Sequence, residues 1–178
     1  MVFKAKMIRI LDIIISSLSI IILMPIFIIF FFLGWLKFRS PIFVQKRLGI
    51  NLKVFKIFKF KTMITNSYQA SHFIKKKDIP KYGEFLRRTK IDELPQLFNV
   101  LKGDMSLVGP RPCLLNQKKL ITERKKRNIF KIKPGITGLA QIRGVDMSTP
   151  KRLSKIDTKM LKINIFDYFK YILMTLKK

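Results

Sequence analysis

The chain has 178 residues, with 37 Lys and Arg against 10 Asp and Glu, and a formal net charge of +27. This length fits one domain, and the charge implies an anionic partner such as a nucleic acid, a membrane surface or a phosphorylated substrate. The single Cys113 excludes an intramolecular disulfide, and the single His72 argues against a zinc site or histidine-based acid–base chemistry. Any chemistry must therefore rely on carboxylates, hydroxyls and basic groups.

The first expected element is a long apolar helix. No charged side chain occurs from Ile13 to Leu36, which is long enough to cross the roughly 30 Å hydrocarbon core of a membrane. Pro25 lies at its midpoint, where proline bends or breaks a helix. Basic residues flank both ends, and such residues stay on the cytoplasmic side. We therefore expect a re-entrant helix over residues 1–38, with a single span as the alternative. The run is too long for a cleaved signal peptide.

One acid lies at the start of this helix. Asp12 follows Arg9 by three residues, which places both side chains on one helical face. Because an unpaired charge in the interface is expensive, we expect Asp12 to form an ion pair with Arg9.

The remaining residues, 39–178, contain no internal repeat or low-complexity linker, so we expect one continuous unit. The patterns predict a strand in Val54–Lys61, preceded by Val44–Gly49, a loop in Asn66–Pro80 and a helix in Tyr82–Arg88. A further helix is predicted from the spacing of Leu94, Leu97, Phe98 and Leu101, with Gly103 as its end.

Four elements are expected in the last third. They are a short strand over Met105–Val108, a basic helix over Gln117–Lys133, a turn over Pro134–Gln141 that leads into an extended run, and a C-terminal helix with an apolar stripe from Phe166 to Leu176. We expect this last helix in the membrane interface, with packing in the core as the alternative.

Asp92 and Glu93 are adjacent acids in a chain that has few acids. The simplest interpretation is that Asp92 caps a helix that begins near Glu93, with Pro95 in its first turn. The alternative is a site where Arg87 and Arg111 hold a phosphate and a divalent cation brings it to the carboxylates. Adjacent helical side chains diverge, so the two acids are expected to have different roles. Attack of an Asp carboxylate on phosphorus is a known form of covalent catalysis.

The turn Gly109-Pro110-Arg111-Pro112 favours the second interpretation. Two prolines fix the backbone around Arg111, so its guanidinium loses little further entropy when it binds an anion. The alternative is a rigid exposed turn with an incidental arginine.

Five stretches of the chain are similar to the bacterial sugar transferase family, the small monotopic phosphoglycosyl transferases. They are Gln45-Lys46-Arg47-Leu48-Gly49, Phe58-Lys59-Phe60-Lys61-Thr62-Met63, Asp92 through Ser106, Gly109-Pro110-Arg111-Pro112, and Pro134-Gly135-Ile136-Thr137-Gly138. With the N-terminal helix they cover most of the chain in the order and spacing of the family.

The resemblance implies a monotopic enzyme at the cytoplasmic face of the bacterial inner membrane. Its fold would be a small, mostly helical α/β catalytic domain over residues 39–178, with a re-entrant membrane helix over residues 1–38 and interfacial amphipathic helices. It would move a sugar 1-phosphate from a UDP-sugar to polyprenyl (undecaprenyl) phosphate and release UMP. This is the first membrane step in assembling an exopolysaccharide, O-antigen or glycoprotein glycan.

The resemblance also implies roles for single residues. Asp92 would form a covalent phosphosugar intermediate and contribute to metal binding, Glu93 would be its partner acid, and Mg²⁺ would be the cofactor. The expected phosphate and substrate contacts are Arg87, Arg111, Lys59 and Gln141.

The chain departs from the family pattern at three places. Met24 precedes Pro25 where relatives often have Ser, and Ile142-Arg143-Gly144 follows Gln141 where they often continue toward Asn-Gly. An aromatic residue that is usual in the following segment is missing near Thr149-Pro150-Lys151. The departures after Gln141 concern the identity of the sugar rather than the reaction. The extra N-terminal domain of larger relatives is not expected.

Two other functions remain open. A membrane-tethered nucleic-acid or lipid binder is favoured by the charge and the interleaved aromatic residues, but it leaves Asp92 and Glu93 unexplained. A Mg²⁺-dependent phosphohydrolase would use the same site with water as the acceptor. The expected partners are a UDP-sugar, polyprenyl phosphate and anionic membrane lipids, and no nucleic acid is expected. The sequence predicts no oligomeric state.

Overall fold

The computed structural model describes residues 2–64 and 79–177, so His72 and most of the loop predicted over Asn66–Pro80 lie outside the described residues. The described part is mostly helical with two small sheets, which confirms the predicted class at this level. The elements are α1 (Val2–Phe38), β1 (Ile42–Leu48), η1 (Ile50–Leu52), β2 (Val54–Phe60), α2 (Lys81–Arg88), η3 (Ile91–Glu93), α3 (Gln96–Lys102), β3 (Ser106–Val108), α4 (Lys118–Lys126), η4 (Ile129–Lys131), β4 (Gly135–Thr137), α5 (Leu139–Ile142), α6 (Pro150–Asp157), η5 (Thr158–Lys162) and α7 (Ile165–Leu176).

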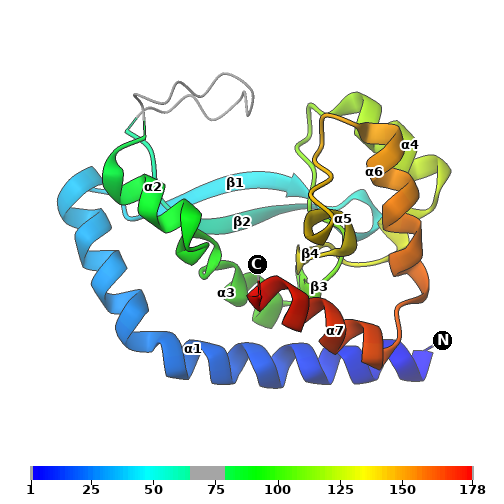
Figure 1. Cartoon of the computed structure of the whole chain (residues 1–178), viewed down its shortest axis with the longest axis horizontal. Helices are drawn as coiled ribbons and strands as arrows, with labels where there is room; N and C mark the ends of the chain where they lie inside the picture. Colours follow the sequence, from blue (N-terminus) through cyan, green and yellow to red (C-terminus); the bar gives the residue numbers. More distant parts are fainter. Residues whose placement is uncertain (1, 65–78, 178) are drawn as a thin grey trace.

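Helix α1 is bent into two arms. The first arm runs beneath the rest of the molecule, and the second rises along one end of it (Figure 1). It contains Pro25, which removes a backbone hydrogen bond and accounts for the bend. The first arm is held by Arg9, which donates to two carbonyl oxygens in the last turn of α3 at 2.5 and 2.7 Å. The second arm accepts a hydrogen bond at the Phe30 carbonyl oxygen from the Tyr82 hydroxyl at 3.0 Å. Both arms therefore contact the same body.

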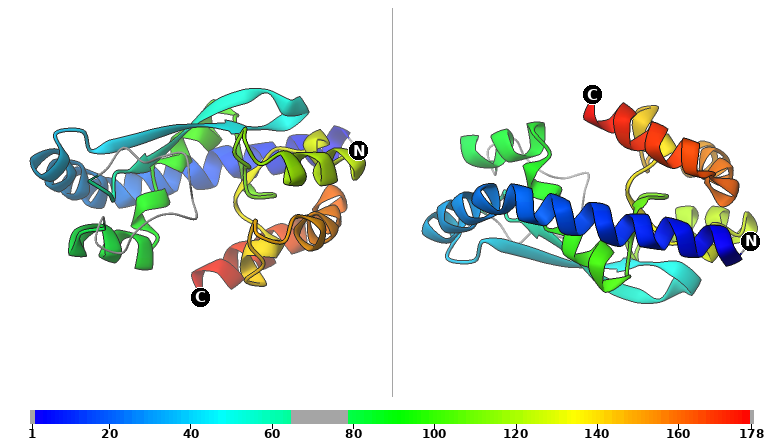
Figure 2. Two further views of the ribbon diagram at one scale, coloured as in Figure 1. Left: turned by 90° about the horizontal axis from the view of Figure 1, so that it is seen from above. Right: turned by 90° about the horizontal axis from the view of Figure 1, so that it is seen from below.

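The outer surface of α1 is apolar and exposed. The segment Ala5–Phe38 is long and apolar enough to cross a membrane, and only 17% of its most apolar window is buried. A core helix of a soluble protein would be mostly buried, so this exposure indicates membrane association. Helix α7 adds exposed side chains such as Phe166 and Leu176, and it lies on the same side of the molecule as α1 (Figure 2).

Strands β1 and β2 form an antiparallel hairpin in which Phe43 pairs with Lys59 and Arg47 pairs with Phe55. Because side chains alternate along a strand, Arg47 and Lys59 lie on the same face of the hairpin. The buried Asn99 joins α3 to β2, since its side chain accepts a hydrogen bond from the Phe58 amide at 3.0 Å and donates one to the Lys56 carbonyl at 2.7 Å.

Strands β3 and β4 pair in parallel, with Ser106 opposite Gly135 and Val108 opposite Thr137. The backbone after β3 approaches β4 so closely that a Cβ on Gly135 would lie 2.0 Å from the amide nitrogen of Gly109. Only glycine fits there. The Gly109 amide also donates to the Thr137 carbonyl at 2.8 Å, which fixes the start of the turn that carries Arg111.

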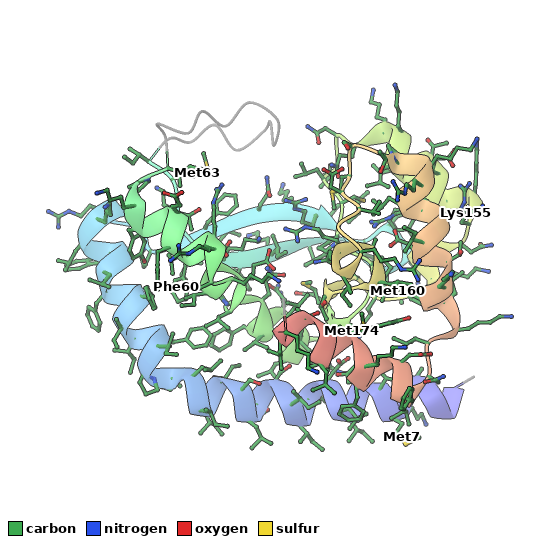
Figure 3. The ribbon with its side chains drawn as sticks, in the orientation of Figure 1. Met7, Phe60, Met63, Lys155, Met160 and Met174 are labelled. Carbon is green, nitrogen blue, oxygen red and sulfur yellow. The ribbon has the colours of Figure 1, made fainter. Side chains whose placement is uncertain are left out.

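Two clusters of buried apolar side chains stabilise this arrangement. The larger one has members from α1, β2, α3, β3 and α7, and the smaller one includes residues of α4, α5 and α6. Phe60 lies between the hairpin and the second arm of α1 (Figure 3), where its ring is 5.8 Å from that of Phe27 and 6.5 Å from that of Phe30. The bent helix α1 therefore packs against the core with one face, while its other face forms the exposed apolar surface.

Asp12 joins three elements, but not through the expected ion pair with Arg9. Its carboxylate is 1% exposed and accepts hydrogen bonds from the Ser106 hydroxyl, the Leu107 amide and the Tyr168 hydroxyl at 3.0, 2.9 and 2.8 Å. The prediction was wrong because the guanidinium of Arg9 is used by the carbonyl groups of α3, whereas tertiary packing supplies neutral donors to Asp12.

Two further expectations need correction. The extended run predicted after the Pro134–Gln141 turn is wrong, because the amides of Ile142 and Arg143 bond back to the carbonyls of Gly138 and Leu139 and form α5. The basic helix predicted to reach Lys133 ends at Lys126, since Asn128 adopts a left-handed conformation with φ 58°. The helices α2 and α7 and the strand β3 occur where they were predicted, and α3 ends at Gly103 as predicted, with φ 92°. The location of α7 in the membrane interface stays a prediction.

Candidate active site

The acidic pair lies in a tight turn between α2 and α3. Lys90 adopts a left-handed conformation with φ 58°, and Ile91–Glu93 form the single turn η3. Helix α3 begins only at Gln96, and Pro95 at its N-cap position makes no side-chain cap hydrogen bond. The interpretation of Asp92 as the cap of this helix is therefore wrong, and its carboxylate is left for other contacts.

Glu93 is held by two cations. Its Oε1 accepts from Lys59 Nζ at 2.5 Å and from Arg111 Nη2 at 3.1 Å. Burial by itself would raise the pKa of Glu93, but the charges and hydrogen bonds of Lys59 and Arg111 outweigh it and lower the pKa to about 2. Glu93 is therefore a fixed anion that joins β2 to the turn containing Arg111.

Asp92 has a different environment although it is the next residue. It is 8% exposed, it accepts no hydrogen bond from the residues that the structure describes, and its Oδ2 lies 3.7 Å from Lys59 Nζ. Burial raises the pKa of Asp92 and the charge of Glu93 adds to the rise, while Lys59, Arg87 and Arg111 oppose it. The lone pairs of Asp92 therefore remain available to a phosphorus atom or a cation.

Arg87 contributes charge near the pair without touching it. Its Nε donates to the Thr62 hydroxyl at 2.9 Å, which ties the last turn of α2 to the segment after β2. The positive charge of Arg87 acts to lower the pKa of Asp92. The structure thus brings Arg87 to the edge of the site predicted for it.

The turn that presents Arg111 is supported from behind by a buried ion pair. Arg124 of α4 donates to Asp157 Oδ2 through Nε at 3.0 Å and Nη2 at 2.8 Å, and through Nη1 to the backbone carbonyl of Arg111 at 2.8 Å. Both side chains of the pair are nearly inaccessible. Sequence analysis missed them because Arg124 is one of many basic residues in α4 and Asp157 is 33 positions away.

A small hollow lies beside Glu93, and we call it the Arg111 hollow. Its lining comes from the hairpin, η3, α3, the Arg111 turn and β4, and comprises Arg47, Ile57, Lys59, Glu93, Gln96, Arg111, Pro112, Gly135 and Ile136. Arg47 was not singled out as a site residue from the sequence. The available signal was its strand alternation with Lys59, which places both side chains on one face of the hairpin.

Gln141 and Pro25 lie away from this hollow. Gln141 in α5 donates from Nε2 to the Ile136 carbonyl at 2.9 Å, so it supports β4 and does not line the hollow. Pro25 lies inside α1. The predicted residues that the structure brings together are therefore Asp92, Glu93, Lys59 and Arg111, with Arg87 at the edge.

No cluster of three or more His, Cys, Asp or Glu side chains is found in residues 2–64 and 79–177 that would hold a metal by itself. A second surface hollow lies at the start of α6 and is lined by Thr149, Pro150, Lys151, Arg152 and Lys155. Lys155 points away from the body of the protein (Figure 3), and no acid lines this hollow. Of these two hollows, which the described residues line, the Arg111 hollow is the one that combines a carboxylate, that of Glu93, with cations.

The chain matches one protein-family model over nearly its whole length. Residues 3–178 match the model described as Bacterial sugar transferase. The matched part includes α1, the hairpin, the acidic pair and the Arg111 turn.

Several known proteins are similar to the chain. The "Uncharacterized sugar transferase EpsL" of Bacillus subtilis (strain 168) is 47% identical over 111 residues, or 61% of this chain and 54% of that protein. The "UDP-glucose:undecaprenyl-phosphate glucose-1-phosphate transferase" of Klebsiella pneumoniae is 42% identical over 152 residues, or 81% of this chain and 31% of that protein. The "Putative undecaprenyl-phosphate N-acetylgalactosaminyl 1-phosphate transferase" of Bacillus subtilis is 38% identical over 133 residues, or 72% and 70%. The chain spans about a third to a half of several of these relatives.

Proposed function

The chain belongs to the bacterial sugar transferase family, and from this premise we propose that it transfers a sugar 1-phosphate from a UDP-sugar to polyprenyl phosphate. The names of two relatives include undecaprenyl phosphate, and one of these names also includes UDP-glucose. The observation that carries the proposal is the contrast within the acidic pair: Glu93 accepts hydrogen bonds from Lys59 and Arg111, whereas Asp92 accepts none from the described residues and lies 3.7 Å from Lys59.

In the first step Asp92 is the nucleophile. A carboxylate oxygen attacks the phosphorus that bears the sugar, the bond from this phosphorus to the bridging oxygen breaks, and UMP leaves with the electron pair. The product is a covalent aspartyl-phosphosugar. The absence of a hydrogen bond to the Asp92 carboxylate among the described residues supports this role, since no donor must be displaced before attack.

In the second step a phosphate oxygen of the polyprenyl phosphate attacks the same phosphorus. The bond to Asp92 breaks, the carboxylate is regenerated, and a polyprenyl diphosphate sugar is released. Lys59 and Arg111 stabilise the developing charge on the phosphoryl oxygens in both steps. Glu93 acts through them, because its carboxylate fixes both cations on one side of Asp92.

The residues at the site fit Mg²⁺ as a cofactor through one carboxylate. Mg²⁺ is commonly bound by one or two carboxylates together with substrate phosphates and water. Asp92 is the carboxylate that would hold it, because Glu93 is already occupied by Lys59 and Arg111. When bound, the ion would neutralise charge on the diphosphate of the donor.

We further propose that α1 is re-entrant and that the reaction takes place at the cytoplasmic face of the inner membrane. Both arms of α1 contact the same body, through Arg9 on the first arm and Phe30 on the second, which supports a helix that enters and leaves on one side. The basic residues on both flanks favour the cytoplasmic side. The exposed apolar side chains of α7 would rest in the interface beside α1.

The test is to incubate the full chain in lipid nanodiscs with a panel of UDP-sugars and Mg²⁺, without polyprenyl phosphate. We expect the matching sugar to release about one UMP per protein and to add the mass of a phosphosugar to the peptide containing Asp92. Continued release of UMP without the acceptor would instead indicate a phosphohydrolase. Release of no UMP from any UDP-sugar, with or without the acceptor, would refute the proposal.

A further inference from the structure

We propose that Arg47, together with Arg111, binds the phosphate of the departing nucleoside monophosphate, so that the nucleotide end of the donor lies toward Arg47 and the sugar-bearing phosphate lies at Asp92. This inference rests on the proposed function and adds the orientation of the donor and a leaving-group contact. It makes Arg47 a catalytic residue of the first step only.

The structure places Arg47 in the lining of the Arg111 hollow. Its Nη1 donates to the Pro112 carbonyl at 3.2 Å, so it lies against the same rigid turn that presents Arg111. Its Nη2 donates to Gln45 Oε1 at 2.6 Å, which fixes the plane of the guanidinium. Arg47 on the hairpin and Arg111 on the rigid turn line the same hollow, and two guanidinium groups in one hollow can bind one anion together.

The charges around the hollow are unbalanced. Its charged lining residues are three cations, Arg47, Lys59 and Arg111, and one acid, Glu93. The Arg47 Nε is buried and has no hydrogen-bond partner among the described residues. Burial, and secondly the charge of Arg111, lower the pKa of Arg47 to about 10. The two cations repel each other in the partly buried hollow. A phosphate dianion that binds between them would make their electrostatic energy favourable.

The hairpin gives the site a direction. Arg47 pairs with Phe55, and Lys59 lies four residues beyond Phe55 on β2, which corresponds to about 13 Å along the strand. Lys59 is the cation 3.7 Å from Asp92, whereas the neighbouring groups whose charges act on Arg47 are Arg111, Cys113 and Glu93. Arg111 therefore lies between an Asp92 end and an Arg47 end. A diphosphate that spans them presents its sugar-bearing phosphorus to Asp92 and its nucleotide phosphate to Arg47.

This placement has a defined chemical consequence. When the bond between the attacked phosphorus and the bridging oxygen breaks, the electron pair goes to the oxygen that leaves on UMP. Arg47 and Arg111 stabilise this growing charge, which accelerates the first step. Once UMP has gone, Arg47 has no bonding partner on the substrate, and the transfer to polyprenyl phosphate does not depend on it.

The experiment measures UMP binding to the full chain in nanodiscs by equilibrium dialysis with labelled UMP. We expect Arg47→Gln to raise the dissociation constant for UMP about tenfold or more, the scale of one charge-assisted contact. Arg47→Lys, which keeps the charge but loses the planar fork, should give a smaller increase. The matched control is Lys46→Gln, which removes one charge from the exposed opposite face of the same strand and should leave UMP binding within about twofold.

A second readout separates a leaving-group contact from a merely structural role. In single-turnover experiments Arg47→Gln should slow UMP release, while the covalent intermediate, once formed, should pass to polyprenyl phosphate at the wild-type rate. Equal UMP affinity in wild type and Arg47→Gln, or equal slowing of both steps, would overturn the inference. If the wild type released no UMP from any UDP-sugar, the proposed function would fail, but the binding comparison would still decide whether Arg47 holds the phosphate.

Discussion

Asp12 and Asp92 are both buried but occur in opposite environments. Asp12 accepts three hydrogen bonds from neutral donors on β3 and α7, whereas Asp92 accepts none from the described residues and is surrounded by charges. A buried acid whose hydrogen bonds are satisfied holds elements together. A buried acid that lacks donors in a positive field is available for chemistry. The difference assigns Asp12 a structural role and supports the proposal that Asp92 is the reactive acid.

The largest effect that this comparison predicts is on activity. Asp92→Asn should reduce UMP release and transfer at least about 1,000-fold, because the amide is a very poor nucleophile. The melting temperature in nanodiscs should change little, since no hydrogen bond to Asp92 is lost among the described residues. Retained transfer activity in Asp92→Asn would place the nucleophile elsewhere.

The buried ion pair behind Arg111 should give the next largest effect. Arg124→Leu leaves Asp157 buried without its partner and should cost about 3–5 kcal/mol of unfolding free energy. The double variant with Asp157→Leu should recover part of this stability, because the unpaired charge is also removed. Denaturant unfolding of the single and double variants measures the coupling. Equal stability of the single and double variants would show that the unpaired charge of Asp157 does not cause the loss.

Asp12→Ala tests the structural half of the comparison. Three buried donors lose their acceptor, and we expect a loss of about 2–3 kcal/mol in unfolding free energy. Tyr168→Phe, which removes one of the donors, should cost about 1 kcal/mol. The rate of the chemical step per folded molecule should remain within a few-fold. A loss of that step as large as for Asp92→Asn, in protein that is still folded, would contradict a structural role for Asp12.

The smallest effect is on the pH profile. Burial raises the pKa of Asp92, while the pKa of Glu93 is about 2. Nucleophilic attack needs the ionised form, so activity should fall as the pH drops through the pKa of Asp92, above the range of an ordinary aspartate, while Glu93 stays ionised. Lys59 lowers the pKa of Asp92, so Lys59→Gln should move this acidic limb of kcat/KM to higher pH. A shift to lower pH would argue that the limb reports another group.

The elements predicted best from the sequence are those specified by local patterns. The spacing of Leu94, Leu97, Phe98 and Leu101 and the left-handed conformation available to Gly103 are sufficient to predict α3 and its end. The α5 segment was mispredicted because four residues carry too little periodicity to separate a short helix from an extended run. The start of α3 was mispredicted because Asp92 followed by Pro95 is the pattern of a helix start. In the structure Asp92 lies in the separate turn η3 instead.

At the site, the acidic pair, Lys59 and Arg111 were predicted, and the structure brings them together. Their chemical roles remain predictions that the experiments above address, and the Mg²⁺ site and the re-entrant path of α1 are proposals as well. Arg47, Arg124 and Asp157 were missed because their side chains acquire meaning only from partners on other elements. In a chain with 37 basic residues, no local feature distinguishes an arginine beside a substrate from one in solvent.

The amino-acid sequence alone determined the apolar helix with its proline, the excess of positive charge, most of the helices and strands and the residues of the acidic pair, because these follow from composition and short-range periodicity. Tertiary structure alone decided that Glu93 is hydrogen-bonded by two cations while Asp92 accepts no hydrogen bond from the described residues, that Asp12 bonds to β3 and α7 rather than to Arg9, and that Arg47 and Arg111 line one hollow. The physical reason is that hydrogen bonds and charge effects depend on distances between side chains far apart in the sequence, as with the 156 positions between Asp12 and Tyr168.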